Sequence, residues 1–239
     1  MTNGWDESAA AWIASQGERG DYAREYVLDH PMLRRALRRP FASALDVGCG
    51  EGRFCRMLRA HGVAATGIDP TGALLAEARR LDPEGDYRLG RAEALPFPDA
   101  AFDLVVSYLT LIDIPDIDGA IPEMARVLRP GGALLIANLT SFVTASPDGD
   151  WTQGPGGEGM FRIDNYLEER WAWARWAGIA VHNWHRPLSR YMELLLGSGL
   201  ILRHFDEPRA QGDNPERDAH QARVPWFLVM EWEKPTAAL

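Results

Sequence analysis

The feature that most restricts how this chain can fold is an apolar run that ends in three alternating glycines. Residues 42–47 lead directly into Gly48, Gly50 and Gly52. A short apolar run bounded by glycines is typical of a buried strand that enters a tight turn. Glycines in such a turn let a ligand approach the backbone closely, because no Cβ stands in the way. The run therefore predicts a strand, a turn and a ligand-binding edge.

Strands and helices alternate through the first part of the chain. Strands are expected at residues 42–47, 63–68, 86–89, 101–107 and 133–137, and helices at 53–61, 71–81 and 117–128. Thr71 is expected to cap the second of these helices, and residues 129–132 to form the turn after the third. Such alternation indicates right-handed βαβ units and a parallel sheet.

The flanking segments follow other patterns. Residues 6–15 and 20–38 are predicted to be helices, the first of them capped by Asp6. The later part is expected to form a loop at 141–160, an aromatic-rich segment at 161–186, a helix at 188–196, a strand at 200–205, a polar loop at 206–224 and a strand at 225–233. A length of 239 residues suits one α/β domain spanning residues 1–239.

The charge of the chain argues against nucleic acid as a partner. The formal net charge is −9, whereas a phosphate-binding surface needs clustered Lys and Arg. One local cluster, Arg34, Arg35, Arg38 and Arg39, is interpreted as the solvated face of a helix. No apolar run approaches the roughly 18 residues of a membrane span, and the N-terminus does not resemble a signal peptide.

The two cysteines favour a reducing compartment. Cys49 and Cys55 lie six residues apart around the predicted turn and helix start, which suits neither a structural disulfide nor a zinc site. A cytoplasmic protein with reduced thiols, no metal and no membrane partner is therefore expected.

Two carboxylates near the glycines indicate which ligand the turn binds. Asp69 ends the second predicted strand, 19 residues after Gly50, where a carboxylate can accept the hydroxyl hydrogens of a ribose. A dinucleotide fingerprint would need glycine where Arg53 stands, and Asp46 would repel a pyrophosphate. Asp46 would attract a cation, which favours S-adenosylmethionine, a sulfonium and ammonium ligand without phosphate, over a nicotinamide nucleotide.

With these residues the chain resembles the class I S-adenosylmethionine-dependent methyltransferases, within the methyltransferase type 11 group. The resemblance covers residues 42–139 and rests on five motifs in order, which are Leu45-Asp46-Val47-Gly48-Cys49-Gly50-Glu51-Gly52-Arg53-Phe54, Gly67-Ile68-Asp69-Pro70, Ala92-Glu93-Ala94-Leu95-Pro96-Phe97, Phe102-Asp103-Leu104-Val105-Val106-Ser107 and Glu123-Met124-Ala125-Arg126-Val127-Leu128-Arg129-Pro130-Gly131-Gly132. It implies an α/β, Rossmann-like fold with a seven-stranded, mostly parallel sheet and helices on both faces.

The resemblance also divides the chain into functional segments. They are an N-terminal helical lid at 1–40, a cofactor-binding core at 41–140, a cap insertion after the fifth strand at 141–186, and a C-terminal helix with two strands at 187–239. The cofactor-binding positions that it implies are Asp46, Gly48, Gly50, Asp69, Pro70, Ala92, Glu93 and Ser107. Asp46 would lie near the amino end of the cofactor, and Asp69 would hold the ribose hydroxyls.

One position departs from the family pattern. The family usually has an acid before the Ala92-Glu93 pair, where it can accept from the adenine amino group, and this chain has Arg91. Either Glu93 takes over this contact, or the adenine is held by backbone and stacking alone.

The lid and the cap supply the candidate substrate residues. The cap holds five of the nine tryptophans, either because it packs on its neighbours or because it forms an apolar, aromatic pocket. Substrate contacts are expected from Tyr22, Tyr26, Tyr108, Trp173 and Trp184. Arg24, between the two lid tyrosines, is a candidate for the cofactor carboxylate or the substrate.

A hydroxyl substrate would also need a general base. His182 and His185, at the end of the cap, are the candidates for it, and Asp113 is a further one. The alternative for both histidines is a surface or structural role.

The hypothesis from sequence is an enzyme that transfers a methyl group to O, N or C of a small, apolar or aromatic molecule by in-line displacement. The alternatives are a non-catalytic S-adenosylmethionine-binding protein, a nicotinamide-dependent oxidoreductase and a protein methyltransferase.

Overall fold

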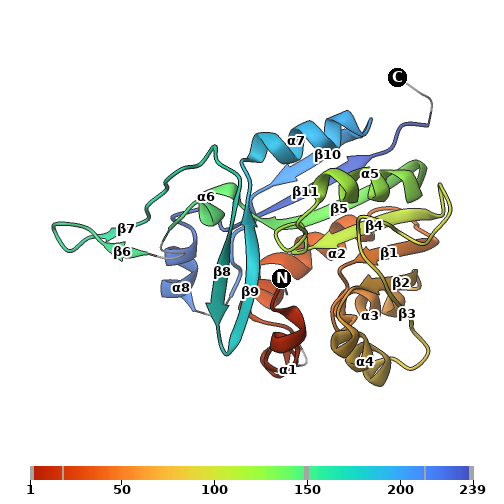
Figure 1. Ribbon diagram of the computed structural model, residues 1–239, viewed down its shortest axis with the longest axis horizontal. Coiled ribbons are helices and arrows are strands. Elements are labelled where there is room, and N and C mark those ends of the chain that lie inside the picture. The colour runs from red at the N-terminus through yellow and green to blue at the C-terminus, as the bar shows by residue number, and fades with distance from the viewer. Residues whose placement is uncertain (1–2, 18, 148–150, 213, 237–239) are drawn as a thin grey trace.

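The computed structural model describes residues 3–17, 19–147, 151–212 and 214–236, and its largest element is a seven-stranded sheet (Figure 1). The strands in spatial order are β10 (Ile201–Asp206), β11 (Phe227–Glu233), β5 (Leu128–Leu139), β4 (Phe102–Tyr108), β1 (Ser43–Val47), β2 (Ala64–Asp69) and β3 (Asp86–Leu89). The five strands from β5 to β3 are parallel, whereas β11 runs antiparallel to both of its neighbours. This confirms the predicted seven-stranded, mostly parallel sheet.

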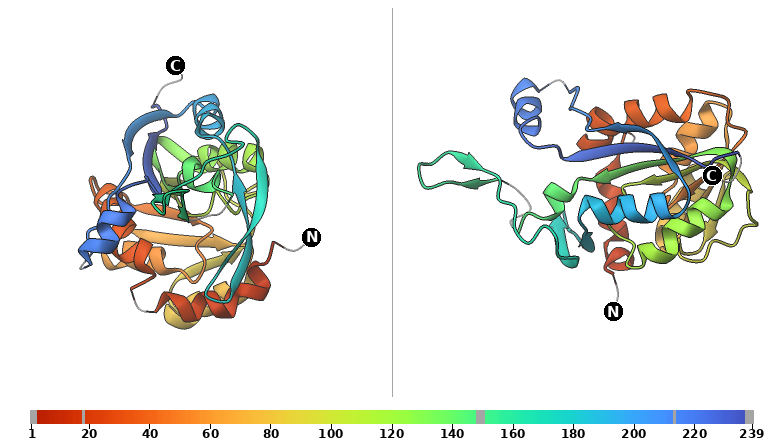
Figure 2. Two further views of the ribbon diagram at one scale, coloured as in Figure 1. Left: turned by 90° about the vertical axis from the view of Figure 1, so that its left-hand side faces the viewer. Right: turned by 90° about the horizontal axis from the view of Figure 1, so that it is seen from above.

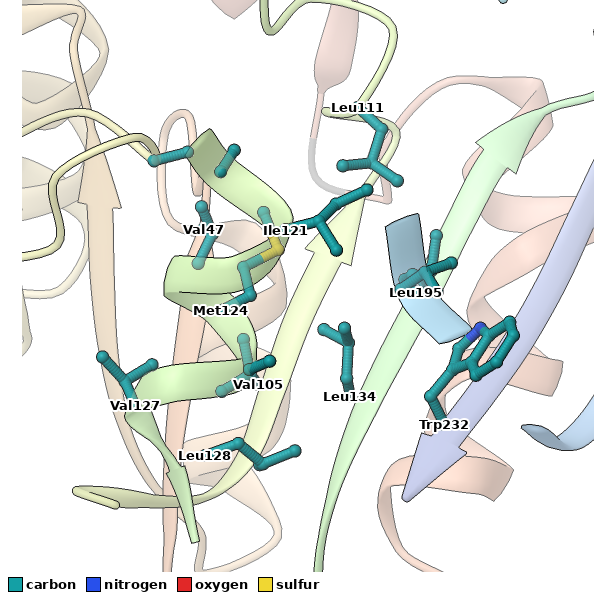
Figure 3. Close-up of a cluster of buried hydrophobic side chains, with 14 of the residues drawn as sticks. Val47, Val105, Leu111, Ile121, Met124, Val127, Leu128, Leu134, Leu195 and Trp232 are labelled. Carbon is teal, nitrogen blue, oxygen red and sulfur yellow. The ribbon is translucent and has the colours of Figure 1, made fainter. Parts of the chain in front are cut away.

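Helices cover both faces of the sheet, as expected. One face carries α5 (Ile117–Val127) and α7 (Leu188–Gly197), and the other carries η1 (Arg24–Leu28), α2 (Asp29–Ala36), α3 (Arg53–Ala60) and α4 (Gly72–Leu81). The strands are apolar on both sides because each face is buried. In β4, for example, Val105 joins the cluster under α5 and α7, while Leu104 and Val106 join the opposite one. Figure 3 shows the first cluster, to which α5 contributes Met124 and α7 contributes Leu195.

The N-terminal helix lies against the cap rather than against the sheet. The cap contains α6 (Ser141–Thr144), the short strands β6 (Thr152–Gln153) and β7 (Gly159–Met160), and an antiparallel hairpin of β8 (Arg170–Trp176) and β9 (Ile179–His185). α1 (Trp5–Gln16) packs beside β9, and Ser8 Oγ exchanges hydrogen bonds with the Ala180 backbone at 3.0 Å. Figures 1 and 2 show α1 and this hairpin side by side, with β6 and β7 projecting away.

Several local expectations were wrong. The helix α1 begins after Gly4, whose φ is +86°, and Asp6 lies inside its first turn instead of capping it. The helix predicted over 20–38 is present without a break over residues 22–36, but its residues 24–28 form the π-helix η1 ahead of α2. The predicted turn at 129–132 lies inside β5 as a bulge, because Leu128 pairs with Phe102 and Ala133 pairs with Leu104.

The two predicted loops also contain structure. The segment 206–224 contains the helix α8 (Pro215–Gln221), which Asn214 caps by accepting from the Arg217 amide. The segment 141–160 contains α6, β6 and β7, and its residues 148–150 lie outside the described part of the chain.

The arginine cluster is not simply a solvated helix face. Arg35 and Arg38, at the end of α2, both bind the carboxylate of Glu231, which is only 1% exposed in the middle of β11. Arg39 donates to the Gly131 carbonyl at 2.6 Å. These arginines therefore fasten α2 to the sheet.

The two cysteines are buried free thiols. Within the described residues, no helix is long and apolar enough to cross a membrane, and no group of His, Cys, Asp and Glu side chains is arranged to hold a metal ion.

Candidate active site

A large cavity lies at the carboxyl end of the parallel strands. β1 has β2 on one side and β4 on the other, so the connections that follow β1 and β4 diverge at this edge. Open α/β sheets bind ligands at such a switch point. The cavity has a volume of about 960 Å³, and its walls come from the loops after β1, β2 and β4, from the N-terminal segment and from the cap.

The glycine turn forms the floor of the cavity. Gly48 and Gly50 have φ values of +76° and +55°, which an L side chain rarely adopts. A Cβ on Gly48 would lie 2.2 Å from Cγ2 of Thr110, so glycine is required there by packing as well. A Cβ on Gly50 would approach only Trp12, at 3.9 Å, which leaves its cavity side open to a ligand.

Asp69 is fixed against this turn. One carboxylate oxygen, Oδ2, accepts from the Gly50 amide at 2.9 Å, and the other accepts from the Thr71 amide at 2.8 Å. Burial raises the pKa of Asp69, and these two backbone bonds oppose the shift. Thr71 occupies the N-cap of α4 as predicted, but its own side chain makes no capping hydrogen bond. Each carboxylate oxygen of Asp69 keeps a lone pair for a hydroxyl in the cavity.

Asp46 is a second buried carboxylate beside the turn, and it is only 2% exposed. Its Oδ2 accepts from the Cys55 thiol at 3.6 Å, while its Oδ1 has no hydrogen-bond partner among the described residues. Burial raises its pKa to about 7. A buried carboxylate with an unsatisfied oxygen has a strong preference for a cationic partner. Asp46 lines a small cavity of about 50 Å³ that shares wall residues with the large one.

Arg24 provides a positive charge at the same end of the site. Its guanidinium pairs with Asp21 at 2.7 Å and lies 4.7 Å from the ring centre of Trp12 and 5.7 Å from that of Tyr108. It lines both cavities. Asp46 and Arg24 thus offer opposite charges to one ligand end, as an amino acid carrying an ammonium and a carboxylate would require.

The expected adenine region lies on the other side of Asp69. Pro70, Ala92 and Glu93 all line the cavity there, together with Arg91. Arg91, which stands where the family usually has an acid, lies 3.5 Å from the Glu93 carboxylate. The negative charge of Glu93 therefore partly balances the positive charge of Arg91.

Ser107 is the one predicted cofactor residue that the structure places away from the site. It is fully buried in β4 and does not line either cavity. The structure therefore does not bring Ser107 to the cavity walls, and its contact with the methionine part stays a prediction.

The substrate predictions for the lid are corrected in part. Tyr22 donates to the Asp218 carboxylate in α8 and lies 5.2 Å, between ring centres, from Tyr26. Neither tyrosine lines the cavity, so the structure does not bring them to the expected substrate region. Tyr108, Trp173 and Trp184 do line it, as expected.

The two histidines fit the structural alternative rather than the general-base role. The His182 ring lies between Trp171 and Trp173, at 4.1 and 4.0 Å between ring centres, and it does not line the cavity. His185 lines the cavity but is 3% exposed, and both of its ring nitrogens are engaged. Nε2 lies 2.8 Å from the Tyr166 carbonyl and Nδ1 lies 2.8 Å from the Thr144 hydroxyl.

This arrangement fixes the state of His185. A carbonyl only accepts, so Nε2 carries the proton, and the lone pair of Nδ1 receives the Thr144 hydrogen. Burial lowers the pKa of His185, which also favours the neutral ring. A neutral imidazole with its lone pair occupied is a structural group, and the general-base role expected of His182 and His185 is not supported.

Other residues of the site were outside what the sequence could indicate. Trp5 and Trp12 in α1, Thr110 after β4, Thr144 in α6 and Asn183 in β9 all line the cavity. Each comes from a segment far from the glycine turn in sequence, and only the fold brings them together.

The residues at this edge fit S-adenosylmethionine. Asp69 offers acceptors for a ribose, Asp46 an unsatisfied oxygen for an ammonium, Arg24 a donor for a carboxylate, and the glycines an open backbone.

Comparison with known proteins points the same way. Residues 45–136 match a family model described as a methyltransferase domain. A malonyl-[acyl-carrier protein] O-methyltransferase from Serratia marcescens is 37% identical over 117 residues, covering 49% of this chain and 46% of that protein. A phosphatidylethanolamine N-methyltransferase from Cereibacter sphaeroides is 40% identical over 100 residues, covering 39% of this chain and 49% of that protein. The chain thus spans about half the length of the curated relatives that it matches.

Solved structures match a larger share of the chain. An S-adenosylmethionine-dependent methyltransferase from Mesorhizobium loti has a TM-score of 0.71 and 27% identity, with 86% of this chain and 99% of that chain covered. A structure from Listeria monocytogenes has a TM-score of 0.74 and 26% identity, with 87% and 98% covered. The likeness therefore extends beyond the region that the family model matches.

Proposed function

Because the chain belongs to the class I S-adenosylmethionine-dependent methyltransferases, whose cofactor is S-adenosylmethionine, we propose that it transfers a methyl group to a small molecule bound under the cap. The observation that carries the proposal is the fixed position of Asp69, whose carboxylate is bonded to the Gly50 amide at the floor of the cavity. A ribose at this position brings the rest of the cofactor over the glycine turn.

When bound, S-adenosylmethionine supplies an electrophilic methyl group on its sulfonium. The protein then has to orient the two reactants and exclude water, and orientation alone can contribute effective molarities of about 10⁵–10⁸ M. Asp46 and Arg24 hold the amino acid end, Asp69 holds the ribose, and Trp173 and Trp184 line the side toward the cap. The cap and α1 close the cavity over these groups.

The shape of the cavity favours a small acceptor with an apolar or aromatic part. A volume of about 960 Å³ accommodates a cofactor together with a modest second molecule. Trp5, Trp173, Trp176 and Trp184 supply apolar walls, where a flat or methylene-rich acceptor would be desolvated. The relatives named for malonyl-[acyl-carrier protein] and phosphatidylethanolamine match about half of this chain or less, so neither substrate transfers directly to it.

A non-catalytic cofactor-binding protein is the second candidate, because binding and turnover use the same edge of the sheet. An oxidoreductase is disfavoured, since Asp46 places a carboxylate beside the turn where a pyrophosphate would lie, and Arg53 stands where a dinucleotide fingerprint needs glycine.

The test is transfer of labelled methyl from S-adenosylmethionine to a panel of small phenols, alcohols, amines and carboxylic acids. Label in any product, dependent on the protein, supports the enzyme. Tight cofactor binding without transfer to any member of a broad panel favours the non-catalytic alternative.

A further inference from the structure

One carboxylate in the cavity has no role in holding the cofactor. Asp113 lies in the segment after β4, on a turn closed by its own amide, which donates to the Thr110 carbonyl at 2.8 Å. It lines the large cavity and keeps part of its surface accessible there. The segment leaves the sheet beside the glycine turn, since Thr110 packs on Gly48, so Asp113 belongs to the same edge as the cofactor site.

The cap holds this carboxylate in place. Asn183 in β9 donates through Nδ2 to Oδ1 of Asp113 at 2.7 Å. The strand is fastened to the same segment, because the Trp184 amide donates to the Ile112 carbonyl at 2.6 Å. A hydrogen bond from a neighbouring strand fixes the orientation of the carboxylate, and a catalytic group requires a fixed orientation.

The electrostatic setting suits proton transfer near neutral pH. Burial raises the pKa of Asp113 to about 8. Of the charged groups that face it, Asp69 at the end of β2 raises the pKa and Arg24 in η1 lowers it, while hydrogen bonds from Trp5 and Asn183 favour the ionised form. A general base works best when its pKa lies near the working pH.

The other candidate base is already engaged. The lone pair of His185 Nδ1 faces the Thr144 hydroxyl, and Nε2 faces the Tyr166 carbonyl. Asp113 thus has an accessible acceptor and an orientation fixed by Asn183, whereas His185 has no free lone pair.

Resting on the function proposed above, we propose that Asp113 accepts the proton from the methyl acceptor, and that this acceptor is a hydroxyl or amine compound rather than a carboxylate. In this step the bond between the acceptor O or N and the methyl carbon forms as the S–CH₃ bond breaks. The electron pair of the broken bond stays on sulfur, giving a neutral thioether. The proton of the acceptor passes to the carboxylate of Asp113 and is then released to solvent.

The same geometry selects against an acidic acceptor. A carboxylate is already ionised and needs no base. It would also lie beside Asp69 and, above about pH 8, beside an ionised Asp113, whose negative charges would repel it. A phenol, an alcohol or an amine brings a proton that Asp113 can take.

The first experiment compares the wild type with Asp113→Asn on the labelled-methyl panel of phenols, alcohols, amines and carboxylic acids. The matched control is Asp86→Asn, which neutralises an exposed carboxylate at the start of β3, outside the cavity. Binding of S-adenosylhomocysteine, measured by calorimetry, shows that each variant is folded. Transfer to hydroxyl or amine acceptors should fall about 10²–10⁴-fold in Asp113→Asn and stay within about threefold in Asp86→Asn.

The pH profile identifies the role of the group. In the wild type kcat/KM should rise with pH as Asp113 loses its proton, and Asp113→Asn should lose this rise. Asn183→Ala should lower kcat more than it changes KM, because it frees the carboxylate without removing it. Equal rates in wild type and Asp113→Asn, or a preference for carboxylic acids, would overturn the proposal while leaving cofactor binding intact.

A second experiment needs no acceptor. If Asp113 faces the methyl group, its charge favours the sulfonium of S-adenosylmethionine over the neutral thioether of S-adenosylhomocysteine. The ratio of the two dissociation constants should then shift in favour of S-adenosylmethionine by about 3–10-fold between pH 6 and pH 8.5, and Asp113→Asn should abolish the shift. Asp46 and Asp69 face groups that both ligands share, so the wild-type-to-variant difference isolates Asp113.

The two experiments separate the possible failures. A ratio that does not change with pH, and is the same in wild type and Asp113→Asn, overturns the assignment of Asp113 whatever the panel shows. Failure of the wild type to bind either ligand overturns the proposed function itself. If no panel compound is methylated, the pH dependence of the ratio of the two dissociation constants alone tests whether Asp113 faces the methyl group.

Discussion

The carboxylate of Asp69 accepts a hydrogen bond from the backbone amide of Gly50, with 2.9 Å between Oδ2 and the nitrogen. This bond joins the end of β2 to the turn after β1, so the acid and the glycine turn form one unit. This hydrogen bond also orients the remaining lone pairs of the carboxylate. These lone pairs would accept from the ribose in the proposed cofactor site.

Replacing Asp69 with Ala should weaken binding of S-adenosylhomocysteine by about 2–3 kcal/mol, because charge-assisted hydrogen bonds to the ribose are lost. Calorimetric titration measures the change. Asp86→Asn is the control, since Asp86 is an exposed acid at the start of β3, and its affinity should match the wild type. Unchanged affinity in Asp69→Ala would refute the ribose assignment.

Gly48→Ala should destabilise the fold by about 3 kcal/mol or more and abolish cofactor binding. The alanine would have to adopt a left-handed backbone conformation with φ of +76°, and its Cβ would also collide with Thr110. Gly62→Ala is the matched variant, since φ is +82° there but no atom lies within 4 Å of the added Cβ. It should cost only about 1–2 kcal/mol and leave affinity unchanged, as urea denaturation and calorimetry can check. Equal effects of the two changes would contradict the close packing at Gly48.

Asp46 should make the apo protein less stable at high pH. Its pKa is about 7 in the folded state and near 4 when unfolded, so the folded state holds a proton that the unfolded state has lost. Stability from this group is present below pH 4 and is lost as the pH rises to 7. Asp46→Asn should therefore be more stable than the wild type at pH 8, by about 2–4 kcal/mol, yet bind S-adenosylhomocysteine more weakly. Urea denaturation at pH 5 and pH 8 tests the first part. A variant that is less stable at pH 8 would contradict it.

His185 should affect stability more than catalysis. Burial lowers the pKa of His185 in the folded state. As the pH falls below about 6.5, His185 is therefore protonated in the unfolded state but still neutral in the folded state. The stability that the neutral ring contributes is thus present at pH 7 and lost toward pH 5. His185→Gln should show a shallower acid loss in thermal unfolding, with methyl transfer within about threefold of the wild type. A 100-fold loss of transfer with a normal fold would restore His185 as the base.

The core of the fold could be predicted because its signals are local. The parallel strands other than β3 contain short apolar runs, and the turn after β1 is marked in the sequence by glycines whose positive φ values the structure confirms. Asp69 could be assigned from its spacing alone, since the end of β2 must lie beside the end of β1 in a parallel pair.

The rest depends on contacts between distant segments. Tyr22 was expected at the substrate, but its partner Asp218 lies 196 residues away in a helix that the polar composition of its segment concealed. The sequence left His185 as either a general base or a structural residue, and only the structure shows that Thr144 and Tyr166 occupy its ring nitrogens. Which side chain meets which in the cap is set by the packing of the hairpin on α1, and no local pattern in the sequence encodes it.

The edge of the sheet around Gly50 and Asp69 is the proposed binding site of the S-adenosyl cofactor. Calorimetric titration of the protein with S-adenosylhomocysteine, with NAD(H) titrated in parallel, tests this site. We expect a dissociation constant in the micromolar range or tighter for S-adenosylhomocysteine, and no detectable binding of NAD(H). Binding of NAD(H) without binding of S-adenosylhomocysteine would contradict it.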